Sequence, residues 1–299
     1  MKRGAERGAA IIMAMLVVAA TSTLVAGAFW RQNVVARQAE NELSYAQAKW
    51  LLRGAVDWAG VILREDARTT TVDHLGEPWA VPLAETQLNK DDGRDPVYIS
   101  GLIRDEQARF NLRNLAGSDG RVNPRELAAL QRLLSLVGAS EGAAEPIAQR
   151  VLAAAPAAGG RQQGAIGLAS VDDLLGLSGV SPAAVERLRP FVTVLPQPTA
   201  INANTAPAVV LAARFENLAL ADAQRLAASR DRAYFKDRTD VLNRIGNLGL
   251  NANDQEIAVA TRFFSVDGTV SYQRARLRAQ ALLRREGNRV EMVWLREAA

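Results

Sequence analysis

The chain has 299 residues, 48% of them hydrophobic, and contains no cysteine. This length leaves room for a membrane span and two or three small lobes with their own cores, and the lack of cysteine excludes disulfides and thiolate metal sites. The formal net charge is only +4, so composition gives no indication of a nucleic-acid-binding surface.

The first thirty residues predict one membrane span. A leader with three basic residues, Met1–Gly8, is followed by the uncharged apolar range Ala9–Trp30. At about 1.5 Å per residue this range forms a helix of ~33 Å, enough to cross a hydrocarbon core of ~30 Å. A cleaved secretory signal is the alternative, but its apolar core has only about 7–15 residues, and no proline precedes Pro78 here.

Beyond the span, the pattern predicts that the helix continues with one apolar face. Apolar residues recur at steps of three and four, namely Leu43, Ala46, Trp50, Leu51, Ala55, Trp58 and Ile62. We therefore predict a continuous helix from about Ala9 to the region of Arg64. Its first half suits lipid, and its second half suits packing on a soluble domain.

Strands are predicted on both sides of a long helical block. Thr69–Pro96 has the proline content of an irregular loop; Val97–Arg104 is predicted as a strand, with Ala108–Leu112 as its hairpin partner. Near the end, Phe263–Val266 is predicted as a strand that turns at Asp267-Gly268.

The last two predicted strands are Val270–Leu283 and Arg289–Arg296, joined by a turn at Glu286-Gly287-Asn288. Both ends of the chain would then build one sheet. The predicted fold class is α+β: a long N-terminal transmembrane helix packed on a small antiparallel sheet, with a large all-α insertion.

The insertion contains a weak duplication that predicts two helical lobes. Phe110–Leu115 and Ile201–Ala206 are both apolar-Asn segments followed by helices. We interpret Asn202 and Asn204 as helix caps, and Asn123-Pro124 and Ser181-Pro182 as helix starts. Glu126 stands at capping-box spacing from Asn123.

The leader resembles a known class. Arg7-Gly8 followed by Ala9-Ala10-Ile11-Ile12-Met13 is similar to the leader of type IV pilins and pseudopilins. The resemblance implies that a prepilin peptidase cuts between Gly8 and Ala9 and that the new amine of Ala9 is a candidate for N-methylation. Most relatives have Glu at the fifth mature position, which is Met13 here.

The departure at Met13 has a physical meaning. A carboxylate in hydrocarbon is costly unless a cation neutralises it, so a subunit without a neighbour on that side is better off without one. The lack of this Glu, the chain length and two segments together make the chain similar to one minor pseudopilin of type II secretion systems, the K component. The two segments are Phe110–Leu115 and Ile201–Ala206.

That resemblance implies a division of the chain. Residues 1–8 would be the leader, 9–30 the transmembrane helix, 31–112 the first part of the pseudopilin body, 113–196 and 197–261 two lobes similar to sterile-alpha-motif domains, and 262–299 the C-terminal strands of the body.

It also implies a non-enzymatic role at the tip of the pseudopilus. The N-terminal helix would bundle with the I and J components, initiating and capping assembly in support of export across the outer membrane. The chain would cross the inner membrane once, with its C-terminal domain in the periplasm, where secreted substrates or the outer-membrane secretin are expected contacts. No nucleic-acid partner is expected.

Calcium is a candidate ligand. Asp119-Gly120 and Asn123…Glu126 reproduce the second half of an EF-hand loop, but its first half is absent, and capping explains Asn123 and Glu126 equally well. A second acidic loop contains Asp91, Asp92 and Asp95, and some members of the family have calcium in the pseudopilin domain. The candidate ligands are thus Asp91, Asp92, Asp95, Asp119 and Glu126.

Two other functional classes have weaker support. Ile201–Ala206, followed by Arg230, Phe235 and Lys236, resembles helix-hairpin-helix DNA-binding modules, although Arg214–Leu218 lacks the glycine that would let backbone N–H groups approach phosphate. A membrane-anchored DNA-uptake protein is therefore the alternative. For catalysis the sequence offers no motif: the single histidine, His74, fits a surface position, and acidic pairs such as Glu65-Asp66 fit solvated faces.

Overall fold

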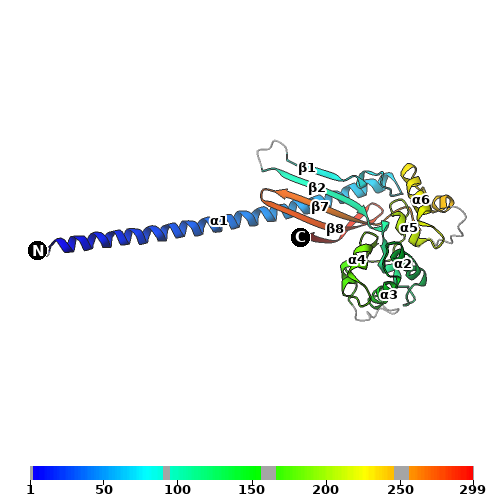
Figure 1. Cartoon of the computed structure of the whole chain (residues 1–299). Helices are drawn as coiled ribbons and strands as arrows, with labels where there is room; N and C mark the ends of the chain where they lie inside the picture. Colours follow the sequence, from blue (N-terminus) through cyan, green and yellow to red (C-terminus); the bar gives the residue numbers. More distant parts are fainter. Residues whose placement is uncertain (1–2, 90–94, 156–165, 246–255, 299) are drawn as a thin grey trace.

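The structure, a computed structural model, describes residues 3–89, 95–155, 166–245 and 256–298. One helix, α1 (Arg3–Thr69), runs from the N-terminal end to the far side of the body without a break (Figure 1). This confirms the predicted continuity from the span into the soluble part. Gly27 and Gly54 do not interrupt the helix, and a side chain at either would meet open space.

The second half of α1 packs on a five-stranded antiparallel sheet in the order β1-β2-β7-β8-β9. Its strands are β1 (Leu83–Gln87), β2 (Val97–Asp105), β7 (Phe263–Tyr272), β8 (Ala275–Glu286) and β9 (Arg289–Ala298). Both ends of the chain therefore build one sheet, as predicted. Buried α1 residues such as Leu52, Val56 and Leu63 lie against side chains such as Phe264 of β7 and Leu277 of β8.

The predicted turn at Asp267-Gly268 is wrong, because β7 continues through it. Gly268 pairs with Gly101 of β2 beneath α1. A Cβ on Gly268 would lie 3.4 Å from Leu52 Cδ1, and one on Gly101 would lie 3.0 Å from the Asp267 backbone oxygen. Glycine here allows close packing of helix on sheet. The chain turns instead at Gln273, with φ of 51°, and at Gly287, as predicted, with φ of 55°.

The strand assignments around β2 also need correction. A 3-10 turn, η2 (Glu106–Ala108), redirects the chain, so β3 (Phe110–Asn111) pairs in parallel with β4 (Val192–Thr193) instead of forming a hairpin with β2. The predicted irregular segment contains η1 (Pro78–Ala80) and edge strand β1. The middle residues of β1 are exposed, so its sequence has no alternating apolar pattern to indicate a strand.

The helical block forms two cores at the end of the body remote from the N-terminus (Figure 1). The first is built from η3 (Leu112–Leu115), α2 (Pro124–Leu136), η4 (Glu141–Ala143), α3 (Ala144–Ala153), η5 (Val171–Gly176) and α4 (Pro182–Leu188). The second is built from β5 (Ile201–Asn202), α5 (Ala208–Arg214), α6 (Leu220–Arg232), α7 (Arg238–Ile245) and β6 (Ile257–Ala258). Helix α5 also packs on α2, which joins the two lobes.

Candidate functional site: the surface of α1 and the seam beneath the second lobe

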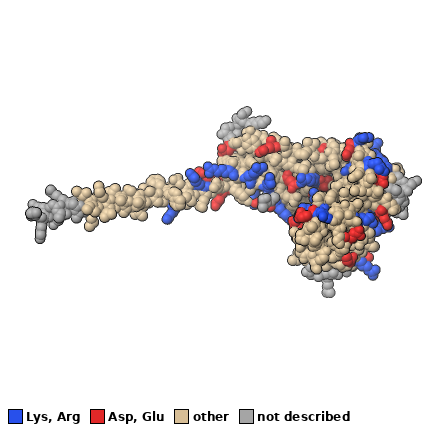
Figure 2. All heavy atoms as spheres, in the orientation of Figure 1, with Lys and Arg blue, Asp and Glu red and all other residues tan. Residues whose placement is uncertain are grey.

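The first half of α1 exposes apolar side chains on every side. Met13 is 71% exposed and Trp30 is 73% exposed, and the large apolar residues between them are also exposed. The hydroxyls of Thr21 and Thr23 donate to the carbonyl oxygens of Val17 and Ala20, both at 2.8 Å, so the helix satisfies its own polar groups. Figure 2 shows this part as almost uncharged. Such a surface requires lipid or protein around it.

The predicted packing face of the second half of α1 is wrong, because its large apolar residues Leu43, Trp50 and Trp58 lie in a stripe that faces away from the sheet. Leu43, Trp50, Trp58 and Val61 are between 47% and 75% exposed. Their spacing places them on the side of the helix opposite the buried residues Leu52 and Val56. The body therefore leaves one apolar face of its own packing helix without a partner within the described part of the chain.

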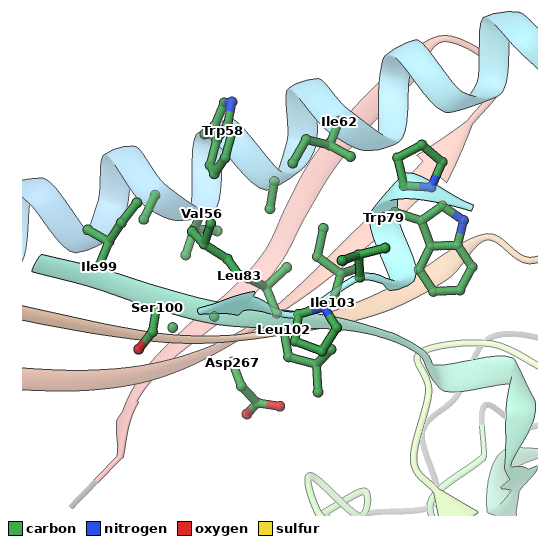
Figure 3. A pocket seen from close by; sticks show the side chains of 18 residues that line it. Val56, Trp58, Ile62, Trp79, Leu83, Ile99, Ser100, Leu102, Ile103 and Asp267 are labelled. Carbon is green, nitrogen blue, oxygen red and sulfur yellow. The ribbon is translucent and has the colours of Figure 1, made fainter. Parts of the chain in front are cut away.

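An apolar groove lies beside this stripe. Because α1 covers β7 to β9, the part of the sheet formed by β1 and β2 keeps a depression of about 230 Å³. Trp58 and Ile62 project from α1 above it, and Leu83 and Ile99 line the strand side (Figure 3). The groove thus extends the exposed apolar surface of α1 onto the sheet.

Charged residues meet inside the molecule at the seam, which we define as Asp66, Asp73, Glu77, Asp105, Asn202, Thr205, Thr261 and Arg285. Arg285 Nη1 donates to Asp66 Oδ2 at 2.8 Å, and Nη2 donates to Asp73 Oδ1. Asp73 Oδ2 accepts from the Thr261 backbone N–H at 2.7 Å. The guanidinium also lies over the Phe264 ring, 4.7 Å from its centroid.

Glu77 belongs to the same cluster. Carboxylate oxygens of Asp66, Asp73 and Glu77 lie within 4.8 Å of one another. Glu77 accepts from Trp79 Nε1 at 2.8 Å and from the Thr70 hydroxyl at 2.8 Å, so its oxygens are occupied by donors of the body itself. All three carboxylates are buried, with exposures of 7% or less.

The seam connects the body to the second lobe through Asp105. Its Oδ2 accepts from Asn202 Nδ2 at 2.8 Å and from the Thr205 hydroxyl at 2.6 Å. Asn202 Nδ2 also donates to the Asp73 carbonyl at 3.1 Å. Asn202 therefore ties the lobe to the body and does not cap a helix. The capping interpretation is wrong, since α5 begins after Pro207, which has no side-chain cap.

Burial raises the pKa values of three carboxyl groups in the seam. It raises the pKa of Asp66 to about 6, with a further contribution from the charge of Glu77. Burial also raises the pKa of Asp105 to about 6, against the hydrogen bonds from Thr205 and Asn202 that lower it. The pKa of Asp73 is raised by burial as well, despite the opposing Arg285 charge.

The other asparagines of the repeated segments also bridge chain segments. Asn204 Nδ2 donates to the Phe235 carbonyl at 3.0 Å and its Oδ1 accepts from the Phe235 N–H at 2.7 Å, which rules out the predicted cap. Asn111 Nδ2 donates to the Gln197 carbonyl at 2.8 Å, and its Oδ1 accepts from the Leu195 N–H at 3.2 Å. The similarity of the two segments thus lies in how they hold the lobes in place.

Two helix starts are confirmed, while Glu126 has a different partner. Asn123 Oδ1 accepts from the Arg125 N–H at 3.1 Å, and Ser181 Oγ accepts from the Ala184 N–H at 3.2 Å. Glu126 Oε2 instead accepts from Arg214 Nη1 at 2.8 Å in a buried ion pair. The capping box is therefore wrong.

The candidate calcium ligands do not meet at one point among the described residues. Asp91 and Asp92 lie outside the described residues, and Asp95 accepts from Gln273 Nε2. Asp119 Oδ1 accepts from the Arg121 N–H at 3.0 Å within its own loop. A cation at Glu126 would compete with the Arg214 guanidinium, so Glu126 fits calcium poorly. The calcium assignment stays a prediction.

Two of the three residues named for the DNA-binding alternative, Arg230 and Phe235, are buried, whereas Lys236 is exposed. Arg230 Nη1 donates to the Ala203 carbonyl at 2.5 Å and the Ala206 carbonyl at 2.6 Å. His74 is only partly exposed, since its ring stacks on Tyr234 of the second lobe at 4.2 Å between centroids. The expected surface histidine therefore lies in the seam region.

Sequence reasoning missed the seam almost entirely. Asp66 was expected on a solvated face, and Asp73, Asp105 and Arg285 stand in no motif. Only Asn202 carried a signal, as a polar residue between apolar ones in a repeated segment. The seam joins residues more than 200 positions apart, such as Asp66 and Arg285, so no local pattern could reveal it.

In this chain a continuous apolar helix becomes the packing helix of a small antiparallel sheet, and helical lobes are inserted between the strands. This architecture defines a pseudopilin with an inserted domain. Two family models, both described as type II secretion system (T2SS) protein K, match residues 108–197 and 201–260. The chain belongs to the type II secretion system protein K family, which makes it a minor pseudopilin.

Curated relatives and a solved structure agree with this assignment. Type II secretion system protein K of Pseudomonas aeruginosa is 32% identical over 295 residues, covering 91% of this chain and 86% of the relative. The protein of the same name from Klebsiella pneumoniae is 28% identical, covering 94% and 93%. The crystal structure of the GspK–GspI–GspJ complex from enterotoxigenic Escherichia coli contains a chain of the same fold, with a TM-score of 0.69, 21% identity and coverage of 88% and 99%. None of these relatives supports the DNA-binding alternative.

Proposed function

We propose that this chain forms the tip of the type II secretion pseudopilus by bundling α1 with the helices of the I and J components. The observation that carries the proposal is the apolar stripe of α1, Leu43, Trp50, Trp58 and Val61, which lies outside the predicted span and stays exposed among the described residues of the body. A related protein K is named in a complex with GspI and GspJ, which supports these two proteins as the partners.

The inserted lobes support a position at the end of the assembly. They lie at the end of the body remote from the N-terminus, where a further subunit would otherwise stack (Figure 1). Met13 in place of the usual carboxylate removes the group that would seek a neighbour's amine within the membrane. From this position the chain would initiate and cap assembly, and the lobes would meet the secreted substrate or the outer-membrane secretin.

Complex formation tests the proposal directly. The full chain in detergent would be mixed with purified I and J components, and the complex detected by size-exclusion chromatography with light scattering. Trp50→Asp should abolish the complex, because Trp50 is 75% exposed in the centre of the stripe. Leu175→Asp, at a 45% exposed apolar position of the first lobe, is the matched control and should bind normally. Normal binding by Trp50→Asp would contradict the proposal.

The leader gives a second test. We propose that prepilin peptidase cuts between Gly8 and Ala9, that Ala9 is then N-methylated, and that the chain crosses the inner membrane once with its body in the periplasm. Mass spectrometry of the mature chain should find Ala9 at the N-terminus, and Gly8→Trp should leave the leader attached. A mature terminus near Ala26–Ala28 would instead indicate a secretory signal.

Calcium binding is a separate proposal for the acidic loops that contain Asp91, Asp92, Asp95 and Asp119. Bound calcium should raise the melting temperature of the full chain relative to the same sample in chelator. Asp119→Asn and Asp95→Asn distinguish the two loops, because only the variant of the binding loop should lose the rise. An unchanged melting temperature in calcium would remove the proposal.

A further inference from the structure

The seam contains more buried negative charge than positive charge. Asp66, Asp73, Glu77 and Asp105 are each at most 7% exposed, whereas Arg285 is the one guanidinium bonded to any of them among the described residues. Fully ionised, the group would hold four negative charges against one positive charge in a region of low dielectric. Such an arrangement is costly, so protons must supply part of the missing positive charge.

We propose that the seam is a clasp tightened by protons: protonated carboxyl groups hold the second lobe on the body, and loss of those protons loosens this lobe. The inference is independent of the proposed tip position, because it concerns only how one lobe of this chain is attached to its own body.

The hydrogen bonds allow both charge states of Asp105. When ionised, Asp105 Oδ2 accepts from Asn202 and from the Thr205 hydroxyl. When protonated, it can donate to the Thr205 oxygen, because that hydroxyl has a second acceptor in the Asn202 carbonyl at 3.4 Å. The contact between body and lobe therefore survives protonation, while the repulsion between Asp105 and the other carboxylates does not.

The charged and titratable groups around the seam come from every element packed on it. Helix α1 contributes Asp66, the loop before η1 contributes Asp73, His74 and Glu77, β2 contributes Asp105, η2 contributes Glu106, β8 contributes Arg285, and the second lobe contributes Arg230 and Tyr234. Glu106 bonds to Thr193 at 2.6 Å and lies 3.4 Å from Arg109, so it faces the first lobe. Arg230 donates to backbone carbonyls of the segment that carries Asn202 and Thr205.

The direction of the effect follows from the shifts of these groups. Burial raises the pKa of Asp66 and of Asp105 to about 6, above the usual value of ~3.9 in an unfolded chain. A raised carboxyl pKa means that folding takes up protons. The stability that the protonated Asp66 and Asp105 carboxyl groups contribute is therefore fully present below about pH 4. It is lost as the pH rises through about 6.

A distance measurement between the body and the second lobe tests the clasp. The chain has no native cysteine, so Arg64→Cys on α1 and Arg232→Cys on α6, both exposed, can carry spin labels without background. In the full chain in detergent, double electron–electron resonance should give a narrow distance distribution at pH 5.0. At pH 8.0 the width should at least double.

Charge-removing variants separate the clasp from general instability. Asp66→Asn and, independently, Asp105→Asn should keep the distribution narrow at pH 8.0, because each removes one of the repelling charges without changing the side-chain shape. Asp57→Asn, at an exposed position of α1, is the control and should broaden at pH 8.0 like the unmodified sequence. Equal widths at both pH values before substitution, or broadening in both seam variants at pH 8.0, would overturn the inference.

Discussion

The first half of α1 and the seam depart from the usual distribution of residues in opposite ways. The helix exposes apolar side chains such as Leu16 and Trp30, whereas the seam buries Asp66, Asp105 and Arg285. The seam completes its hydrogen bonds with atoms of its own chain, but no other part of the chain that the structure describes covers the first half of α1. The first half of α1 therefore depends on its surroundings, whereas the seam depends on its own internal pairing.

The largest expected effect is removal of the central cation of the seam. Arg285→Met should lower the free energy of unfolding by about 3–5 kcal/mol at pH 7.5, because it leaves buried carboxylates without their charged partner. Chemical denaturation of the full chain in detergent measures the change. Arg284→Met is the matched control: its pair with Glu291 is 38% and 40% exposed, and its loss should cost less than about 1 kcal/mol. Equal losses of stability in the two variants would contradict the expectation that the buried ion pair matters more for folding than the exposed one.

The next largest effect concerns the exposed helix. A charge at Leu16, which is 64% exposed in the middle of the apolar range, should disfavour membrane insertion by about 2.5–3.5 kcal/mol. Leu16→Arg should therefore reduce the membrane-bound fraction after alkaline extraction. Val35→Arg, at a 58% exposed position beyond the predicted span, should leave that fraction unchanged. Equal membrane-bound fractions of the two variants would show that the membrane span does not end between Leu16 and Val35.

The sequence alone predicted one of these regions much better than the other. The span, the continuation of α1 and the two-ended sheet all follow from local hydrophobic patterns, since each pattern repeats along one element. The seam depends on Asp105 meeting Asn202 and on Asp66 meeting Arg285 across the fold. The Asp267-Gly268 error has the same origin: Gly268 has its role because Leu52 lies above it, and this contact is invisible in the local sequence.

A smaller effect is expected for the residue that joins lobe and body. Asn202→Ala should cost about 1–3 kcal/mol of stability, because the Asp105 carboxylate loses one buried donor and the Asp73 carbonyl loses its side-chain donor. Thermal unfolding with the control Asn41→Ala, at an exposed position of α1, measures the difference. A loss no greater than that of the control would mean that the other contacts of the lobe, such as the bond from Thr205 to Asp105, hold it without Asn202.

The smallest effect on folding should come from a substitution at Trp50 in the stripe of α1, although Trp50 is the residue that we expect to matter most for assembly. Trp50 is 75% exposed, so Trp50→Asp should change the free energy of unfolding of the isolated chain by no more than about 0.5 kcal/mol. Arg285→Met, in contrast, should weaken folding through a residue that the proposed partner surface does not include. If Trp50→Asp lost stability on the scale of Arg285→Met, the indole would have to pack within its own chain, and the stripe would no longer be a surface left for partners.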